Sequence, residues 1–323
     1  MLRHPLAPDP LAPDGLVRRR TLPPGAQWET LVIDAWPVRT VRWPAAGETS
    51  PGSILFVGGR ADFIEKYGEA YWTWRDEGFG LATFDWRGQG RSGRLGRDAH
   101  LGHGDFDRWT DDLDALSAWF FATMPAPHFI VAHSMGGHLT LRHLARGRSP
   151  FGRAVLLAPM LGIHVAATAP RLIRRLADTA ARFGLGRRYA PLQHGYGAWQ
   201  QRPERQALLT GCPDRFGDEH WWIAADPELA LGGTSFGWLS SAFASIDALF
   251  APGVLEKIAT PLLILAGEDE KLVDLGAIRA AAARLPDARL DIIPHGRHEL
   301  LRDVDAVRAD THQRILAFLK VAA

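Results

Sequence analysis

The sequence lacks the features that mark several large classes of protein. It has one cysteine, Cys212, among 323 residues, so no intramolecular disulfide can form and a cysteine-ligated zinc site is disfavoured. Its 37 Lys and Arg residues are balanced by 36 Asp and Glu residues, which leaves no basic excess for binding nucleic acid. No uninterrupted apolar run reaches the roughly 18 to 20 residues of a membrane-spanning helix. We expect a soluble protein that can fold in a reducing compartment.

The N-terminal segment, residues 1–26, is rich in proline and poor in contiguous apolar residues. This composition argues against a signal peptide. It predicts a flexible leader, because such a segment cannot bury enough surface to become ordered. A cytoplasmic location is therefore expected, with peripheral contact to the inner face of the membrane as a further hypothesis.

From residue 53 onward, short apolar runs bounded by glycine or proline alternate with segments of helical periodicity. This alternation predicts a mostly parallel sheet of about six strands with helices on both faces. Two earlier β-like runs, 28–34 and 37–43, are expected to pair antiparallel at one edge. The later runs span residues 53–59, 80–86, 128–134, 153–159, 261–267 and 288–294.

The alternation stops between residues 161 and 249, where the chain is largely helical in pattern and carries several tryptophans and arginine clusters. Open α/β sheets bind ligands beyond the carboxyl ends of their strands. We therefore interpret residues 161–249 as a helical cap above that edge. The α/β core then comprises residues 27–160 and 250–323.

A serine between an apolar run and a glycine pair is the first candidate for chemistry. Residues 128–141 read HFIVAHSMGGHLTL, which is close to the G-x-S-x-G pattern of a nucleophile elbow, with Ala132 in place of the first glycine. A sharp turn there would expose the hydroxyl of Ser134 and aim a helix N-terminus at it, and Gly136 is the small residue that such a turn requires. Ser134 is the predicted nucleophile, and it needs a base because a serine hydroxyl is otherwise a weak nucleophile.

An acid and a histidine follow Ser134 in the required order. The apolar run ending at Gly267 is followed by EDEKLVD, and counting three positions past that glycine selects Glu270 as the acid, with Asp269 in reserve. The last apolar run is followed by HGRHELLRD, where His298 is preferred to His295 as the base. The acid would hold the imidazole tautomer and stabilise the imidazolium.

The glycine pair at 58–59 predicts a tight turn after the strand at 53–57. The backbone N–H groups of Arg60 and Met135 are the expected oxyanion-hole donors. The glycine pair is not part of a G-x-G-x-x-G dinucleotide loop, and DWRGQGRSG at 85–93 lacks the G-K-[ST] ending of a phosphate loop, so we interpret it as a structural turn. No metal site is predicted, since the two histidines of HLGHGD at 100–105 lie on a loop.

Together these motifs resemble the α/β-hydrolase superfamily, and within it the serine hydrolases that include monoacylglycerol lipases and bacterial lysophospholipases. The resembling segments are VGGRADFIEKYGE, FDWRGQGRSGR, AHSMGGH, LLILAGEDEKLVD and HGRHELLRD, spread from about residue 50 to 303. Residues 208–239 further resemble the bacterial lysophospholipase branch, as does a glutamate where most relatives have aspartate. Ala132 departs from the usual elbow glycine, and Gly58 stands where many relatives have histidine.

The resemblance implies an α/β-hydrolase fold and cleavage of lipid carboxylic esters through an acyl-enzyme on Ser134. His298 would act as the general base, and no cofactor would be required. Within enzymes, the alternatives are a small-ester carboxylesterase and a proline-type aminopeptidase, which would need an acidic pocket for the substrate amine. The non-enzymatic alternative is a catalytically silent binding protein of the hydrolase fold.

An arginine-rich helix is predicted in the cap over residues 170–191. It carries six arginines against a single acid, Asp178, and its apolar residues recur at helical spacing on one face. One interpretation packs the apolar face on the core and leaves the arginines in solvent. The other docks the helix on an anionic membrane or on lipid phosphate headgroups.

Overall fold

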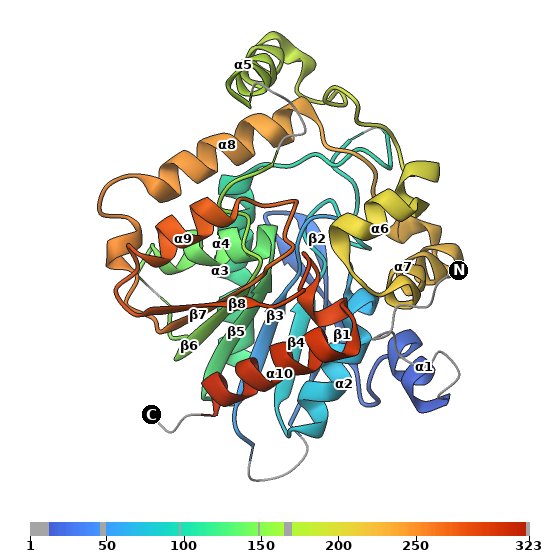
Figure 1. Ribbon diagram of the computed structural model, residues 1–323, viewed down its shortest axis with the longest axis vertical. Helices are drawn as coiled ribbons and strands as arrows, with labels where there is room; N and C mark the ends of the chain where they lie inside the picture. The colour runs from blue at the N-terminus through green and yellow to red at the C-terminus, as the bar shows by residue number, and fades with distance from the viewer. Residues whose placement is uncertain (1–12, 46–49, 97, 148, 165–169, 321–323) are drawn as a thin grey trace.

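The computed structural model describes residues 13–45, 50–96, 98–147, 149–164 and 170–320. Its core is one eight-stranded sheet with the strand order β1-β2-β4-β3-β5-β6-β7-β8 (Figure 1). Strands β3 to β8 run parallel, while β1 pairs antiparallel with β2 at one edge and β2 pairs antiparallel with β4. The two N-terminal runs therefore add to the six later ones in a single sheet. The strands are β1 Gln27–Ile33, β2 Trp36–Trp43, β3 Ser53–Val57, β4 Gly80–Phe84, β5 His128–His133, β6 Arg153–Leu157, β7 Leu262–Gly267 and β8 Ala288–Ile293.

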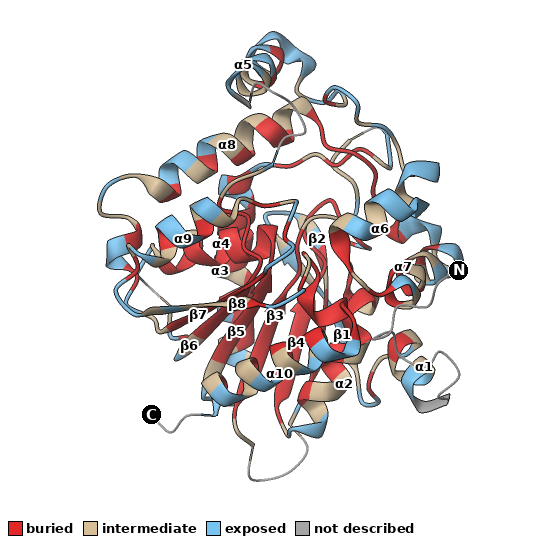
Figure 2. Cartoon of the chain, in the orientation of Figure 1, coloured by how far each residue is buried: buried red, intermediate tan, exposed pale blue. Residues whose placement is uncertain are grey.

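Helices cover both faces of the sheet because alternate strand residues are apolar on each face. In β3, Leu55 and Val57 pack in one buried cluster with α3 (Phe106–Thr123), α4 (Met135–Leu144) and α9 (Leu275–Ala282). Ile54 and Phe56 pack in the other, with α2 (Gly68–Asp76) and α10 (Asp305–Leu319), which lie together on the near face in Figure 1. The central strands are buried along their whole length, as Figure 2 shows. The fold is the predicted α/β arrangement.

A long insertion separates β6 from β7. Figure 1 places α5 and α8 above the sheet and α6 and α7 beside them, and α8 packs on α5, α3 and α4. Its helices are α5 Pro170–Ala180, a π-helical turn Ala181–Leu185, α6 Pro203–Leu209, α7 Pro213–Ala225 and α8 Phe236–Phe250, with 3-10 turns Ala198–Gln201 and Pro227–Leu229. Further 3-10 turns occur at Ile64–Tyr67, Leu255–Lys257 and Leu300–Arg302. None of the helices in the described ranges is long and apolar enough to cross a membrane.

Part of the segment expected to be a flexible leader is an ordered helix, α1 (Pro13–Arg20). Its Arg19 side chain is buried and ion-paired with Asp218 of α7 at 2.8 Å, and Arg20 bonds to the other oxygen of the same carboxylate. The prediction is therefore wrong for this part, because tertiary ion pairs hold a segment whose own composition offers little apolar surface. Residues 1–12 of the predicted leader lie outside the described residues.

Candidate active site

Ser134 occupies the sharp turn between β5 and α4. Its backbone has φ 52° and ψ −116°, a conformation that L-residues rarely adopt and that costs about 1–3 kcal/mol. The surrounding backbone holds this turn: the amide of Ser134 donates to Leu157 O at 2.9 Å, and its carbonyl accepts from Met160 N at 2.9 Å. The turn therefore separates the serine side chain from the neighbouring strand and places it at the start of a helix.

The turn is packed too closely for larger residues at two glycines. A Cβ on Gly136 would lie 2.5 Å from Gly58 O and 2.6 Å from Val57 O. A Cβ on Gly59 would lie 3.0 Å from the Cβ of Ser134. The loop after β3 thus lies directly against the nucleophile. Ala132, which stands in place of the usual elbow glycine, is fully buried in β5, and the sharp turn at Ser134 forms with this alanine present.

The structure brings three predicted residues from different loops into one hydrogen-bonded chain. Ser134 Oγ lies 3.0 Å from His298 Nε2, and His298 Nδ1 lies 2.7 Å from Glu270 Oε2. All three side chains are buried. Glu270 follows β7 and His298 follows β8, so parallel strands deliver both to the same edge of the sheet as the elbow. Asp269 is exposed to solvent, and His295 lies in a left-handed turn at φ 58°.

Two backbone amides fix the orientation of the Glu270 carboxylate. Its Oε1 accepts from Leu272 N at 2.7 Å and from Val273 N at 3.2 Å, which leaves Oε2 for the histidine. Burial would raise the pKa of Glu270, but the charge and hydrogen bond of His298 together with these amides lower it. Burial would likewise lower the pKa of His298, but the Glu270 carboxylate outweighs burial and raises it. The pair is therefore suited to stabilise an imidazolium.

The predicted oxyanion donors flank the serine. Met135 is the first residue of α4, and Arg60 follows the glycine pair that abuts the serine. Within the described part of the chain, neither backbone amide donates to a protein acceptor. Two unpaired amides beside the nucleophile, that of Met135 at a helix start and that of Arg60 in a loop, are what an oxyanion hole requires, since they are free to bind developing negative charge.

Sequence reasoning missed the side chains that support the oxyanion loop. Asp62 Oδ2 accepts from Gly59 N at 2.6 Å, and Gln89 Oε1 accepts from Ala61 N at 2.6 Å. The turn at 85–93 is thus structural, as expected, and it reaches the oxyanion loop through Gln89. Asp62 also lies 3.0 Å from Nδ1 of His133, whose ring packs against that of His298. Their positions in VGGRADF and DWRGQG were visible in the sequence, but their partners were not.

Behind the site lies a buried ionic cluster. Lys66 contacts three carboxylates, those of Asp62, Glu219 and Glu299, each at 2.8 Å. Arg302 pairs with Glu219 and Glu299. Burial alone would raise the pKa of Glu299, but the two cations lower it to about 2. Because removing a cation from such a cluster leaves uncompensated buried carboxylates, we expect the loss of Lys66 or Arg302 to be strongly destabilising.

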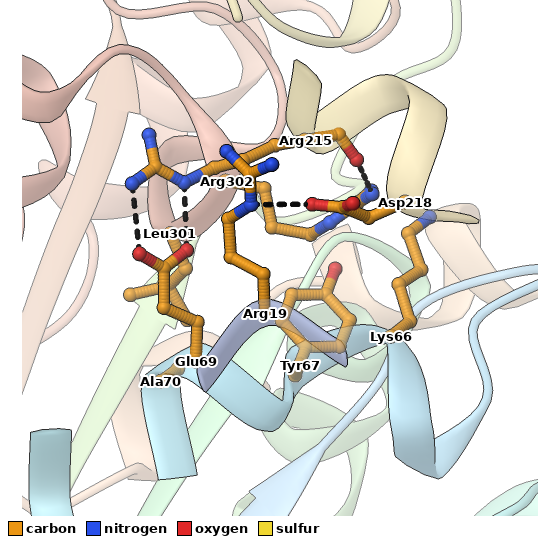
Figure 3. Close-up of a pocket in the computed structure, with 9 residues that line it drawn as sticks. All are labelled: Arg19, Lys66, Tyr67, Glu69, Ala70, Arg215, Asp218, Leu301 and Arg302. Atoms are coloured by element: carbon orange, nitrogen blue, oxygen red, sulfur yellow. Dashed lines mark hydrogen bonds and ion pairs between the residues drawn. The ribbon is translucent and has the colours of Figure 1, made fainter. Parts of the chain in front are cut away.

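This cluster continues into a small cavity that Figure 3 shows. Arg215 of α7 forms two hydrogen bonds with Glu69 of α2, at 2.6 and 2.8 Å. Arg19 of α1 reaches Asp218 across the cavity, and Arg302 donates to the backbone carbonyl of Arg215. Every ionic group that lines the cavity is already paired, and these ion pairs connect the insertion to the core. Among the described residues, no group of three or more His, Cys, Asp or Glu side chains is placed to hold a metal ion.

The fold and the order of its motifs define the class: the protein is an α/β hydrolase. A family model described as serine aminopeptidase, S33, matches residues 49–305, and the chain belongs to this hydrolase family. Lysophospholipase L2 of Escherichia coli is 32% identical over 299 residues, which cover 88% of this chain and 85% of that protein. Probable lysophospholipase L2 of Haemophilus influenzae is 31% identical over 271 residues and 83% of each chain.

Solved structures agree with this assignment at the level of the fold. A soluble variant of monoglyceride lipase from Saccharomyces cerevisiae superimposes with a TM-score of 0.73 at 19% identity, covering 93% of this chain and 97% of that one. Monoacylglycerol lipase of Paleococcus ferrophilus gives a TM-score of 0.68 at 20% identity, with 88% and 98% covered. The comparisons confirm the predicted fold and the resemblance to lysophospholipases and monoacylglycerol lipases.

Proposed function

We propose that the protein hydrolyses the acyl ester of lysophospholipids through an acyl-enzyme on Ser134. The observation that carries the proposal is the hydrogen-bonded chain Ser134–His298–Glu270 in a protein whose 32% identical relative is a lysophospholipase. Monoacylglycerol is the runner-up substrate, since it carries the same ester and the fold resembles that of monoglyceride lipases.

In the proposed mechanism, Ser134 Oγ attacks the ester carbonyl carbon while His298 Nε2 takes the hydroxyl proton. The carbonyl oxygen becomes an oxyanion that the Met135 and Arg60 amides bind. The C–O bond to the glycerol oxygen then breaks, and His298 returns the proton to that leaving alcohol. Water deprotonated by His298 attacks the acyl-enzyme next, which releases the fatty acid and restores the serine. Glu270 holds the imidazole and stabilises its charged form throughout.

The aminopeptidase alternative, which the name of the family suggests, requires an acidic group free to bind the substrate amine. The buried carboxylates near the triad are already engaged: Asp62, Glu219 and Glu299 all contact Lys66. Carboxylates that are already bound to a buried cation are not free to pair with a substrate amine. This supports an ester substrate over an aminoacyl amide.

A hydrolysis panel tests the proposal. It would compare lysophosphatidylcholine, a monoacylglycerol, short p-nitrophenyl esters and aminoacyl amides with the purified protein. Preference for lysophosphatidylcholine supports the proposal, whereas preference for short esters or amides favours the carboxylesterase or the aminopeptidase. Labelling of Ser134 with a fluorophosphonate probe separates an enzyme from a silent binding protein, because the probe reacts only with an activated serine.

The membrane hypothesis, with a cytoplasmic location at the inner face, is the second part of this proposal. Leu172, Leu176 and Phe183 of α5 and the π-helical turn face solvent, with Leu172 65% exposed and Phe183 80% exposed, and α5 lies at the outer tip of the insertion (Figure 2). Ile173 and Ala177 pack inward instead, so only part of the predicted apolar face covers the core. Exposed arginines surround it at positions 171, 175, 182, 187 and 188. An exposed apolar strip flanked by cations matches an anionic lipid surface.

Co-sedimentation with vesicles of phosphatidylcholine, with and without phosphatidylglycerol, tests this contact. We expect Leu172→Ser combined with Phe183→Ser to lower binding to anionic vesicles at least tenfold. Val32→Ser, at an equally exposed apolar side chain on β1, is the matched control and should leave binding unchanged. The hypothesis would be refuted if binding did not depend on phosphatidylglycerol and was unchanged by the substitutions at Leu172 and Phe183.

A further inference from the structure

Arg60 differs from the other arginines that hold the core together. Arg39, Arg87 and Arg302 each pair with a carboxylate at hydrogen-bonding distance. Within the described residues, the Arg60 guanidinium meets no carboxylate: it donates to the carbonyl of Gly232 in the insertion, and its Nε is buried without a partner. A shielded cation without a counter-ion is costly unless an anion joins it.

A second unpaired cation lies nearby. Arg205 of α6 is half-buried and also has no carboxylate partner in the described part of the chain. Burial, and after it the charge of Arg205, lower the pKa of Arg60 to about 10. The group still carries its proton at neutral pH, so the two cations repel each other. An anion bound by both would relieve the desolvation and the repulsion.

One further donor beside Arg60 is also unsatisfied. The guanidinium lies 5.9 Å from the ring centroid of Trp238, whose Nε1 is buried without an acceptor. Buried N–H groups are nearly always paired in folded proteins. An unpaired N–H beside an unpaired guanidinium favours an oxyanion as the ligand of this site.

The position of this pair matches the chemistry of the proposed substrate. The backbone N–H of Arg60 is the proposed oxyanion donor, so its guanidinium lies within one side-chain length of the ester carbonyl. From backbone nitrogen to the guanidinium carbon there are as many covalent bonds as from the ester carbonyl carbon of a lysophospholipid to its phosphorus. Each span is about 7 Å at full extension. One residue can therefore hold the carbonyl oxygen with its amide and the phosphate with its side chain.

We propose that the guanidinium groups of Arg60 and Arg205 bind the phosphate of the substrate headgroup, and that this site selects lysophospholipids over monoacylglycerols. The inference rests on the proposed function for the identity of the ester. Guanidinium groups suit this role because they bind phosphate oxygens in pairs of parallel hydrogen bonds. A monoacylglycerol of the same chain length would leave both cations unpaired, and therefore binds the same pocket less well.

The test compares kcat/KM for a lysophosphatidylglycerol and for the monoacylglycerol with the same acyl chain. Arg205→Gln and Arg60→Gln should each lower the ratio of the two values about 10- to 100-fold, the effect of losing a hydrogen bond to a charged group. Using a ratio removes any effect that Arg60→Gln has on the oxyanion loop itself. Arg202→Gln, at an exposed arginine just before α6, is the matched control and should leave the ratio unchanged. An equal loss on both substrates, or an unchanged ratio, would overturn the inference.

A binding measurement separates this inference from the proposed function. Protein carrying Ser134→Ala cannot turn over, so calorimetric titration with lysophosphatidylglycerol reports recognition alone. Adding Arg205→Gln should weaken that binding about tenfold or more, whether or not the wild-type protein hydrolyses the lipid. Titration with inorganic phosphate distinguishes a headgroup site from a free-phosphate site. Tight binding of inorganic phosphate without preference for the lysophospholipid over monoacylglycerol would also refute the proposal.

Discussion

Replacing Glu270 by glutamine tests the assignment of the catalytic acid directly. Glutamine has the same shape, and its carbonyl oxygen can keep accepting from Leu272 N and Val273 N as Oε1 does now. Its NH2 group would then face His298 Nδ1. Because an NH2 group only donates, Nδ1 must become the acceptor and the proton must move to Nε2. In that tautomer Nε2 cannot take the proton of Ser134.

The expected loss follows from this wrong tautomer. A triad whose acid is exchanged for its amide loses about 10⁴-fold in kcat in the serine protease template, which corresponds to about 5.5 kcal/mol of barrier. We expect a similar loss for Glu270→Gln, with KM changed little. Asp269→Asn is the matched control, because Asp269 is exposed and one position away. It should retain kcat within about twofold, since exposed positions away from the site rarely matter.

The pH dependence gives a second readout of the same change. Although burial acts to lower it, the pKa of His298 is raised by the Glu270 carboxylate. The base works only when neutral, so wild-type activity falls as pH drops through this raised pKa. In the glutamine variant the residual activity should persist to lower pH. The measurement is kcat/KM for a soluble ester across pH 4–9. A damaging Asp269→Asn change, or a Glu270→Gln variant within tenfold of wild type, would show that the acid is assigned wrongly.

Three further predictions concern the elbow and its supports, and a fourth concerns α7. Ser134→Ala should abolish fluorophosphonate labelling while leaving the melting temperature within a few degrees, and retained labelling would place the nucleophile elsewhere. Asp62→Asn should lower kcat about 10- to 100-fold with little change in KM, because it weakens the hold on Gly59 N, and a pure KM effect would contradict this role. Gly136→Ala should lower kcat at least about 100-fold, because its methyl would overlap the carbonyls of the oxyanion loop. Gly217→Ala, where nothing lies within 4 Å of the added Cβ, should instead stabilise α7 by about 0.5–1 kcal/mol in denaturant unfolding.

The sequence was sufficient for the parts of the molecule that local patterns determine. Apolar runs of five to eight residues bounded by glycine or proline predicted the strands, because strands buried on both faces need unbroken apolar sequence. The order of Ser134, Glu270 and His298 past strand ends placed them at one edge, since parallel strands share a direction. The geometry agrees with these expectations to within hydrogen-bonding distance.

The sequence was insufficient where partners are far apart along the chain. Lys66 and Glu219 are more than a hundred residues apart, and nothing in either segment alone identifies the pair. The same holds for Arg19 and Asp218, which is why the proline-rich composition around α1 wrongly predicted flexibility there. The exposure of Phe183 was also hidden, because helical periodicity identifies an apolar face but not what covers it.

The two halves of the insertion are attached to the core very differently, and this has a consequence for engineering. Helix α7 is held by buried ion pairs of Arg215, Asp218 and Glu219 to three separate elements of the core and N-terminus. Among the described residues of α5, the ion pair that joins the helix to another element is that of Arg174 with Asp247 of α8, and both side chains are partly exposed. Random mutagenesis confined to α5 and the π-helical turn would therefore change the proposed lipid-binding surface without preventing the protein from folding. A library in α7 would mostly return unfolded chains.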